Sequence, residues 1–161
     1  MGDIYRNINS SVAGLKPVFW FVPVGDVLSV TNGIVVLKSG KQWFTARSTK
    51  FKNVFTSQQK EGDIHGVELK ALITKDSPDL EYVLSKLSTL MGYLVVYCDN
   101  NGYYWLVGTL KTPLKFLSAY SSGNAPGNSV GITYSFSGNV LSFPKQQFND
   151  SITAVPVPIT D

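Results

Sequence analysis

The side chains that could carry out catalysis are few in this chain. His65 is its single histidine and Cys98 its single cysteine. A nucleophile activated by a histidine would therefore require the fold to join these two residues. A histidine in a polar, glycine-flanked stretch such as GDIHG is more often solvated, and a cysteine in an apolar run is more often a small buried hydrophobe. The sequence predicts a protein that is not an enzyme.

Metal and cofactor sites are equally unsupported by the residue types. Transition-metal centres need clustered imidazole and thiolate ligands, and this chain has one of each. Asp99, Asn100 and Asn101 resemble part of a calcium loop, but the downstream glutamate is missing and turn chemistry explains these residues. Neither GxxxxGK[ST] nor GxGxxG occurs in the sequence. We therefore expect no metal and no cofactor.

Charged residues are segregated by sign along the chain. No acidic residue lies between Asp26 and Glu61, whereas 38–60 contains six basic residues interleaved with aromatic ones, and 61–81 contains six acids. Three interpretations remain open: an ordinary solvated face, a surface that binds nucleic acid through phosphates and stacking, or a basic edge that meets the acidic edge of the next subunit in a head-to-tail ring. For the ring, the predicted interface residues are Lys50, Phe51, Lys52, Phe55, Lys60, Glu61, Asp63, Asp79 and Glu81.

Composition favours a subunit of an assembly. Charged residues make up 16% of the 161 residues and hydrophobic residues 43%, so the charged coat usual for a soluble monomer is thin. The net charge of +3 allows anionic partners. No apolar run approaches 18 residues and the N-terminus lacks the pattern of a secretory signal, so we expect neither membrane insertion nor secretion.

Hydrophobic periodicity predicts short antiparallel strands and one helix. Apolar alternation indicates strands from residue 18 onward. We expect the polar residues 49–66 to form a mobile excursion, either a long loop or an extended, flexible hairpin. Ser77, Pro78 and Gly92 are typical of the start and stop of a helix over 77–91. We expect one domain over 18–144, preceded by an arm (1–17) and followed by an extended tail (145–161).

The segment after the helix predicts an aromatic hairpin with two apolar faces. Asn101-Gly102 is a strong turn signal, and a loop of two or four residues gives the same pairing. One face would then carry Leu94, Val96, Cys98, Tyr103, Trp105 and Val107. Such a hairpin must be covered by a second sheet on one side and by the helix or a neighbouring subunit on the other. The predicted core comprises Leu80, Val83, Leu84, Leu87, Val96, Trp105, Val107, Ile132, Tyr134 and Phe136.

These elements predict a mainly β fold: an antiparallel β-sandwich or rolled sheet flanked by a single α-helix. Their order resembles that of bacteriophage tail-tube proteins and related head-tail connector ring proteins. The resemblance rests on the excursion 49–66, the helix 77–91, and the run VVYCDNNGYYWLVGTLKTPLKF followed by a Gly-rich loop and GITYSFSG. The chain looks like virion proteins from phages of gut Bacteroidetes, over residues 18–144.

The resemblance implies a structural protein of the virion, made in the host cytoplasm. Its partners would be copies of itself in a ring, hexameric or dodecameric, together with neighbouring virion proteins and DNA that passes without sequence specificity. The basic residues in 27–60 depart from a negatively lined lumen, which favours an interface role for that segment. Two alternatives remain: a monomeric β-sandwich that binds glycan or protein through aromatics at 103–105 and the loop 118–131, and a single-stranded nucleic-acid binder that uses 38–55.

Overall fold

The structure is a computed structural model that describes residues 14–48, 53–73, 85, 87, 92–121, 131–141, 143–150, 152 and 154–156. These residues form twelve β-strands and one short 3₁₀ helix. In chain order the elements are β1 (Leu15–Pro23), η2 (Val24–Asp26), β2 (Val27–Thr31), β3 (Ile34–Leu37), β4 (Trp43–Arg47), β5 (Val54–Glu61), β6 (Ile64–Ile73), β7 (Tyr93–Asp99), β8 (Tyr104–Val107), β9 (Lys115–Ser121), β10 (Gly131–Leu141), β11 (Gln146–Gln147) and β12 (Ala154–Pro156).

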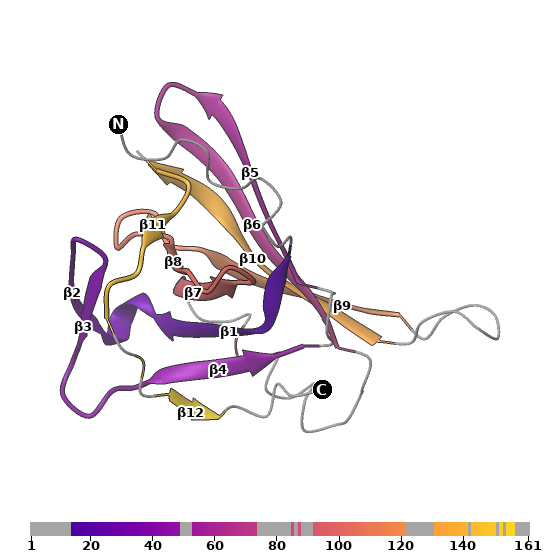
Figure 1. The fold of residues 1–161 in the computed structure, drawn as a ribbon, viewed down its shortest axis with the longest axis horizontal. Coiled ribbons are helices and arrows are strands. Elements are labelled where there is room, and N and C mark those ends of the chain that lie inside the picture. Colours follow the sequence, from indigo (N-terminus) through magenta and orange to yellow (C-terminus); the bar gives the residue numbers. More distant parts are fainter. Residues whose placement is uncertain are drawn as a thin grey trace.

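The strands form three sheets (Figure 1). The six-stranded sheet has the order β11-β8-β7-β1-β4-β12, the four-stranded sheet has the order β5-β6-β10-β9, and β2 pairs with β3. Neighbouring strands are antiparallel except β4 and β12, which run parallel. The prediction of a mainly β fold with antiparallel sheets is confirmed.

The two larger sheets pack face to face because each presents a row of apolar side chains to the other. Alternate residues of a strand share one face, and in β6 and β10 these rows match: Leu69 lies opposite Phe136, and Ala71 opposite Tyr134. All four side chains are buried. From the facing sheet, the ring of Phe21 approaches that of Phe136 to 5.3 Å between centroids. The main core therefore lies between these two sheets.

The middle strands of the six-stranded sheet are buried on both faces. Tyr93, Val95 and Tyr97 of β7 belong to the main core, whereas Leu94 and Val96 belong to a second core on the outer face. This double burial explains the unbroken apolar run YLVVYC. Within the described residues, the β2–β3 hairpin and Phe148 cover the second core, in the place where the helix or a neighbouring subunit was expected.

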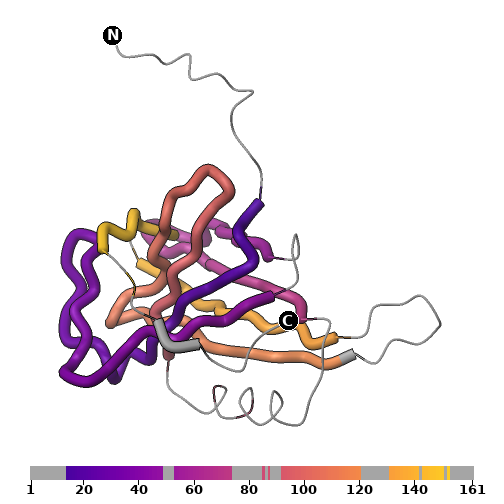
Figure 2. The backbone as a smooth tube through the Cα atoms, turned by 60° about the horizontal axis from the view of Figure 1, so that its bottom comes forward, coloured from indigo at the N-terminus to yellow at the C-terminus, as the bar shows by residue number. Residues whose placement is uncertain are grey.

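The turn between β7 and β8 corrects the predicted pairing of that hairpin. The backbone N–H of Asp99 donates to the Tyr103 carbonyl oxygen at 3.0 Å, so the loop has three residues, the last of which is Gly102 with φ of 89°. A residue with positive φ at this position is typical of three-residue hairpin loops. Figure 2 shows this hairpin extending beyond its sheet.

An odd loop length shifts the second strand by one residue relative to a loop of two or four. Val95 therefore lies opposite Val107 and Val96 opposite Leu106. The predicted grouping of Val96 with Trp105 and Val107 on one face is wrong. Val96 and Val107 are buried in different cores, and Trp105 is partly buried against the main core.

The single flanking helix is not borne out. No α-helix is among the elements of the described chain, and only Ser85 and Leu87 of the predicted range 77–91 are described. Within the described residues, the four-stranded sheet covers most of the inner face of the six-stranded sheet. Leu87 is 9% exposed in the main core, and the Tyr93 hydroxyl donates to its carbonyl oxygen at 2.8 Å. The predicted core residues Leu80, Val83 and Leu84 lie outside the described residues.

The predicted C-terminal tail is part of the domain. β11 pairs with β8, β12 pairs with β4, and Phe148 between them is buried in the second core. A boundary after residue 144 is therefore wrong, because the burial of Phe148 ties this segment to the sheet. Pro156 lacks an N–H donor, and a sheet edge is where a strand tolerates proline.

The boundaries of the N-terminal arm and of the polar excursion also change. β1 begins at Leu15, inside the predicted arm 1–17, and residues 1–13 lie outside the described residues. Most of the described excursion is the β5–β6 hairpin, which rises above the sandwich in Figure 1. Seven of the eight side chains of β5 are exposed, so its sequence lacks the apolar alternation that identifies a strand.

Candidate assembly interface

The four-stranded sheet has two long open edges. β5 and β9 are its outer strands, with eight and seven residues, and neither pairs with a further strand within the described residues. An edge strand presents unpaired N–H and C=O groups, which can pair with a strand from another chain. The two edges lie on opposite sides of one sheet, which is the arrangement needed to join copies side by side.

The six-stranded sheet has short edge strands instead. Its outer strands are β11, with two residues, and β12, with three. Very short edge strands are one way in which proteins prevent unwanted strand pairing. The contrast between the two sheets indicates that the open edges of the four-stranded sheet are available for pairing.

Apolar side chains accompany one of the open edges. On β9, Leu117 is 59% exposed and Tyr120 is 53% exposed, whereas their neighbour Phe116 is buried in the main core. On β5, Val54 is 44% exposed and the following exposed residues are polar. Exposed large apolar groups beside an unpaired strand edge are typical of a contact surface.

The outer face of the four-stranded sheet is polar and hollowed. A groove of about 440 Å³ crosses β5, β6 and β10, with Gln58, Gly66 and Asn139 aligned in register across the three strands. The stem of Lys60 passes over Gly66, where a Cβ atom would lie 2.9 Å from its Cε. Glu68 belongs to the next row of the same groove.

The interface residues predicted from charge are only partly described. Lys60, Glu61 and Asp63 are exposed around the β5–β6 turn. Phe55 packs within the chain, where it is partly buried and its ring is stacked on that of Tyr97 at 5.2 Å. The remaining predicted residues, Lys50, Phe51, Lys52, Asp79 and Glu81, lie outside the described residues.

Within the described residues, the segregation of charge along the sequence does not produce a basic edge opposite an acidic edge. The described parts of the segments 38–60 and 61–81 meet in one hairpin, because β5 and β6 are antiparallel neighbours. Lys41 pairs with Asp26 of the same chain, with Nζ 3.4 Å from Oδ1. Strand edges, rather than charge, are therefore the feature that distinguishes the two sides of this sheet.

The described aromatic residues of the basic segment 38–60 pack in the interior. Trp43 is 4% exposed and its ring meets Phe148 at 5.8 Å, while Phe44 packs on Phe21 at 5.7 Å. Base stacking needs accessible ring faces. The described part of the segment 38–55 thus gives its rings to the two cores rather than to a surface for nucleic acid.

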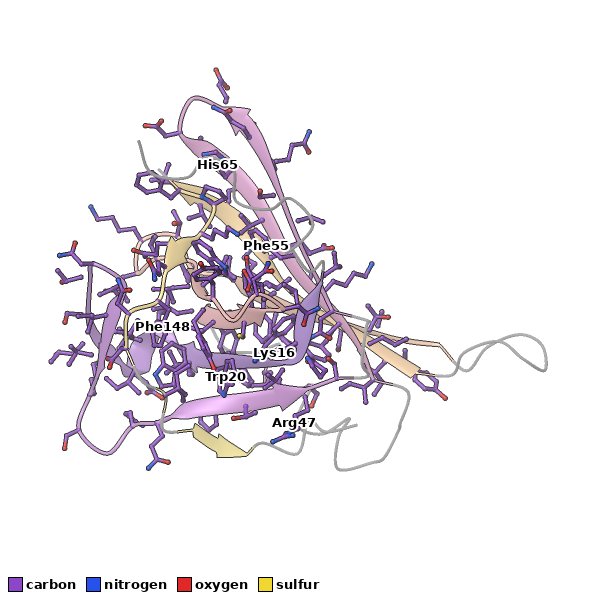
Figure 3. The ribbon with its side chains drawn as sticks, in the orientation of Figure 1. Lys16, Trp20, Arg47, Phe55, His65 and Phe148 are labelled. Carbon is purple, nitrogen blue, oxygen red and sulfur yellow. The ribbon has the colours of Figure 1, made fainter. Side chains whose placement is uncertain are left out.

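The residues considered for chemistry are not brought together. His65 lies on β6, in the extended hairpin labelled in Figure 3, whereas Cys98 is buried on β7 of the other sheet. Burial raises the pKa of the Cys98 thiol, which disfavours the reactive thiolate. Among the residues that the structure describes, no group of three or more His, Cys, Asp or Glu could hold a metal ion, and no helix could span a membrane.

Asp99 organises the β7–β8 turn. Its Oδ1 accepts backbone N–H groups from Asn101 at 2.9 Å and Tyr103 at 3.0 Å, and its Oδ2 accepts the Trp105 indole N–H at 3.0 Å. The turn chemistry expected for this run is confirmed. Comparison of the chain with protein-family models, curated proteins and solved structures gave no significant match.

Proposed function

We propose that this chain is a non-enzymatic structural subunit of a phage virion, which assembles into rings around the DNA conduit of a tail tube or head-tail connector. The observation that supports this proposal is the pair of long open edges on opposite sides of the four-stranded sheet. A contact between two different edges is head-to-tail, and such contacts generate rings when the rotation closes.

The strand directions are compatible with this contact. The four strands alternate in direction, so β9 of one copy runs antiparallel to β5 of the next. The antiparallel pattern would continue unbroken around the ring. Antiparallel pairing is also slightly more stable per residue than parallel pairing. Leu117 and Tyr120 point to opposite faces of β9, so the contact would have an exposed apolar side chain on each face.

The two faces of the sheet fit different positions in such a ring. The larger six-stranded sheet covers one face and fits the outside, where the circumference is greater. The polar outer face of the four-stranded sheet, with its groove at Gln58, Gly66 and Asn139, would then line the conduit. A face without exposed aromatic rings on those rows suits the passage of DNA without sequence specificity. The hexameric or dodecameric order, the neighbouring virion proteins and the location in the virion belong to the same proposal.

Native mass spectrometry tests ring assembly through multiples of the 17.6 kDa chain. Replacing Leu117 and Tyr120 by Lys should shift the protein to monomer, because lysines on an edge strand oppose strand pairing. The matched control is Leu28→Lys, at a side chain that is 65% exposed on β2 and away from the open edges. A wild-type chain that stays monomeric up to high concentration, or a double variant that assembles normally, would contradict the proposal.

The second candidate function is a monomeric binding module for glycan or protein. Exposed rings at the β7–β8 hairpin favour it, since Tyr103 and Tyr104 are 39% and 40% exposed. In that case the native mass spectrum should contain only monomer, and Tyr103→Ala or Tyr104→Ala should reduce affinity for the ligand without changing the mass.

A further inference from the structure

Lys145 lies among three aromatic rings at the place where the two larger sheets meet. Its Nζ is 4.0 Å from the centre of the Trp105 ring, 5.9 Å from that of Phe55 and 6.0 Å from that of Tyr97. A cation within about 6 Å of a ring centroid is attracted by the negative face of the ring. The rings of Phe55, Tyr97 and Trp105, which we call the cage, therefore surround an ammonium group that belongs to the same chain.

The cage joins the two sheets. Tyr97 and Trp105 lie opposite each other on β7 and β8, so their side chains share one face of the six-stranded sheet. Phe55 comes from β5 of the four-stranded sheet and is labelled in Figure 3. Its ring is stacked on that of Tyr97, with 5.2 Å between centroids and 28° between ring planes. The cage is thus complete only when β5 lies against the six-stranded sheet.

Phe55 is the one side chain of β5 that is not exposed. Within the described residues, β5 pairs with β6 along one edge and has its other edge open. Its position relative to the six-stranded sheet therefore depends on Phe55 and on the groups that pack on that ring. Lys145 is one of these groups, and the backbone just after it is fixed, because Gln146 and Gln147 of β11 pair with β8.

A carboxylate adds negative charge at the rim of the cage. Asp99 accepts the indole N–H of Trp105 on its Oδ2 at 3.0 Å. Burial and the charge of Asp99 raise the pKa of Tyr97, so the field of this carboxylate also reaches a second ring. The neighbouring cation Lys16 interacts with Cys98, which points to the other face of β7 from Tyr97. The charges around the cage therefore favour a cation inside it.

We propose that the cage is an ammonium-binding site, and that Lys145 fills it as a latch that holds β5 against the six-stranded sheet. A lysine that only covers apolar surface packs its stem there and keeps its charged head in water. Here the head itself is 4.0 Å from the centre of the Trp105 ring. The latch acts within one chain, so it does not depend on ring assembly and is tested on the monomer.

Thermal melting tests whether the charge of Lys145 matters. Lys145→Gln, which keeps a polar end without the charge, should lower the thermal midpoint by about 2–4 °C. Lys145→Arg keeps a cation that can lie over aromatic rings and should stay closer to the wild type. The matched control is Lys70→Gln, at an exposed side chain on β6, which should change the midpoint little. A Lys145→Gln midpoint equal to that of the control, or an equal loss in Lys145→Arg, would overturn the proposal.

Amide exchange tests whether the latch holds β5. Exchange in β5 should become about fivefold faster in Lys145→Gln, because local opening of this strand becomes easier. Exchange in β9, the other open edge, should stay constant, since its buried Phe116 packs on Tyr134 and Phe136 away from the cage. Unchanged exchange in β5, or an equal increase in both edge strands, would show that Lys145 does not act on β5.

Ligand rescue tests the binding site itself. Lys145→Ala removes three carbons and the ammonium, which are the atoms of propylammonium. Propylammonium chloride should raise the thermal midpoint of Lys145→Ala by at least about 1 °C more than equal concentrations of 1-propanol or potassium chloride, because a ligand that binds the folded chain stabilises it. The wild type should show no such difference, since Lys145 occupies the cage. Equal effects of propylammonium and 1-propanol on Lys145→Ala would overturn the assignment of an ammonium site.

Discussion

Two buried tyrosines provide a matched test of how a buried hydroxyl changes the free energy of unfolding. Tyr93 and Tyr134 are both 0% exposed, and replacement by Phe removes a single hydroxyl from each. The Tyr93 hydroxyl donates to the Leu87 carbonyl oxygen at 2.8 Å. The Tyr134 hydroxyl has no hydrogen-bond partner within the described residues. The nearby Ser48 hydroxyl donates to Asn53. The two substitutions should therefore differ in their effect.

The expected magnitudes follow from these surroundings. Tyr93→Phe removes the buried hydrogen bond to the Leu87 carbonyl oxygen, and this loss costs about 1 kcal/mol of the free energy of unfolding. Tyr134→Phe removes a buried hydroxyl whose unpaired state itself costs about 1–3 kcal/mol, so stability should be unchanged or higher. The two variants should differ by at least about 1 kcal/mol, or about 2–4 °C in the thermal midpoint of a chain of this size.

Urea denaturation and thermal melting of the two variants measure this difference. The slope of the free energy of unfolding against urea should match that of the wild type, because neither change alters the surface exposed on unfolding. A loss of stability in Tyr134→Phe as large as that in Tyr93→Phe would refute the reasoning, because it would mean that the Tyr134 hydroxyl is hydrogen-bonded in solution.

Two further predictions concern the β2–β3 turn and alkaline pH. Gly33→Ala should lower the thermal midpoint more than Gly40→Ala, because both glycines have φ of 75° but only at Gly33 would a Cβ atom lie 2.0 Å from the Gln147 carbonyl oxygen. Burial raises the pKa of Tyr93 from 10.0 to about 12. The contribution of Tyr93 to the free energy of unfolding is therefore complete below pH 10 and is lost as the pH rises toward 12. Thermal midpoints measured across this window should fall less steeply in Tyr93→Phe than in the wild type.

The strand content could be predicted wherever one face of a strand is buried. The alternation of Ile132, Tyr134 and Phe136 reports a strand directly, because the period of two is imposed by the core. β5 gave no such signal, since its exposed side chains after Val54 are polar on both faces. The β7–β8 pairing depended on whether the loop length was odd or even, which Asn101-Gly102 does not determine.

The surfaces were harder to predict than the strands. The open edges depend on which strand ends each sheet, and sequence order does not reveal this, because β10 lies between β6 and β9. A hollow on the outer face of the six-stranded sheet brings together Trp20, Tyr104 and Phe148, although these residues are far apart in the chain. The prolines of AVPVPITD indicated an extended segment, but only the fold shows that its described strand pairs with β4.

The pairing of β12 with β4 also means that β4 is translated long before one of its partner strands. Ala154 pairs with Trp43, so the partner of this edge is translated about 110 residues later. At about 5–20 residues per second, the edge of β4 waits on the order of 5–20 s on the ribosome before its partner is made. Throughout that interval, the edge of β4 that later pairs with β12 is unpaired in the nascent chain. Crowded polysomes should therefore be where this protein is most exposed to mispairing between copies, and slower translation should lengthen the exposure.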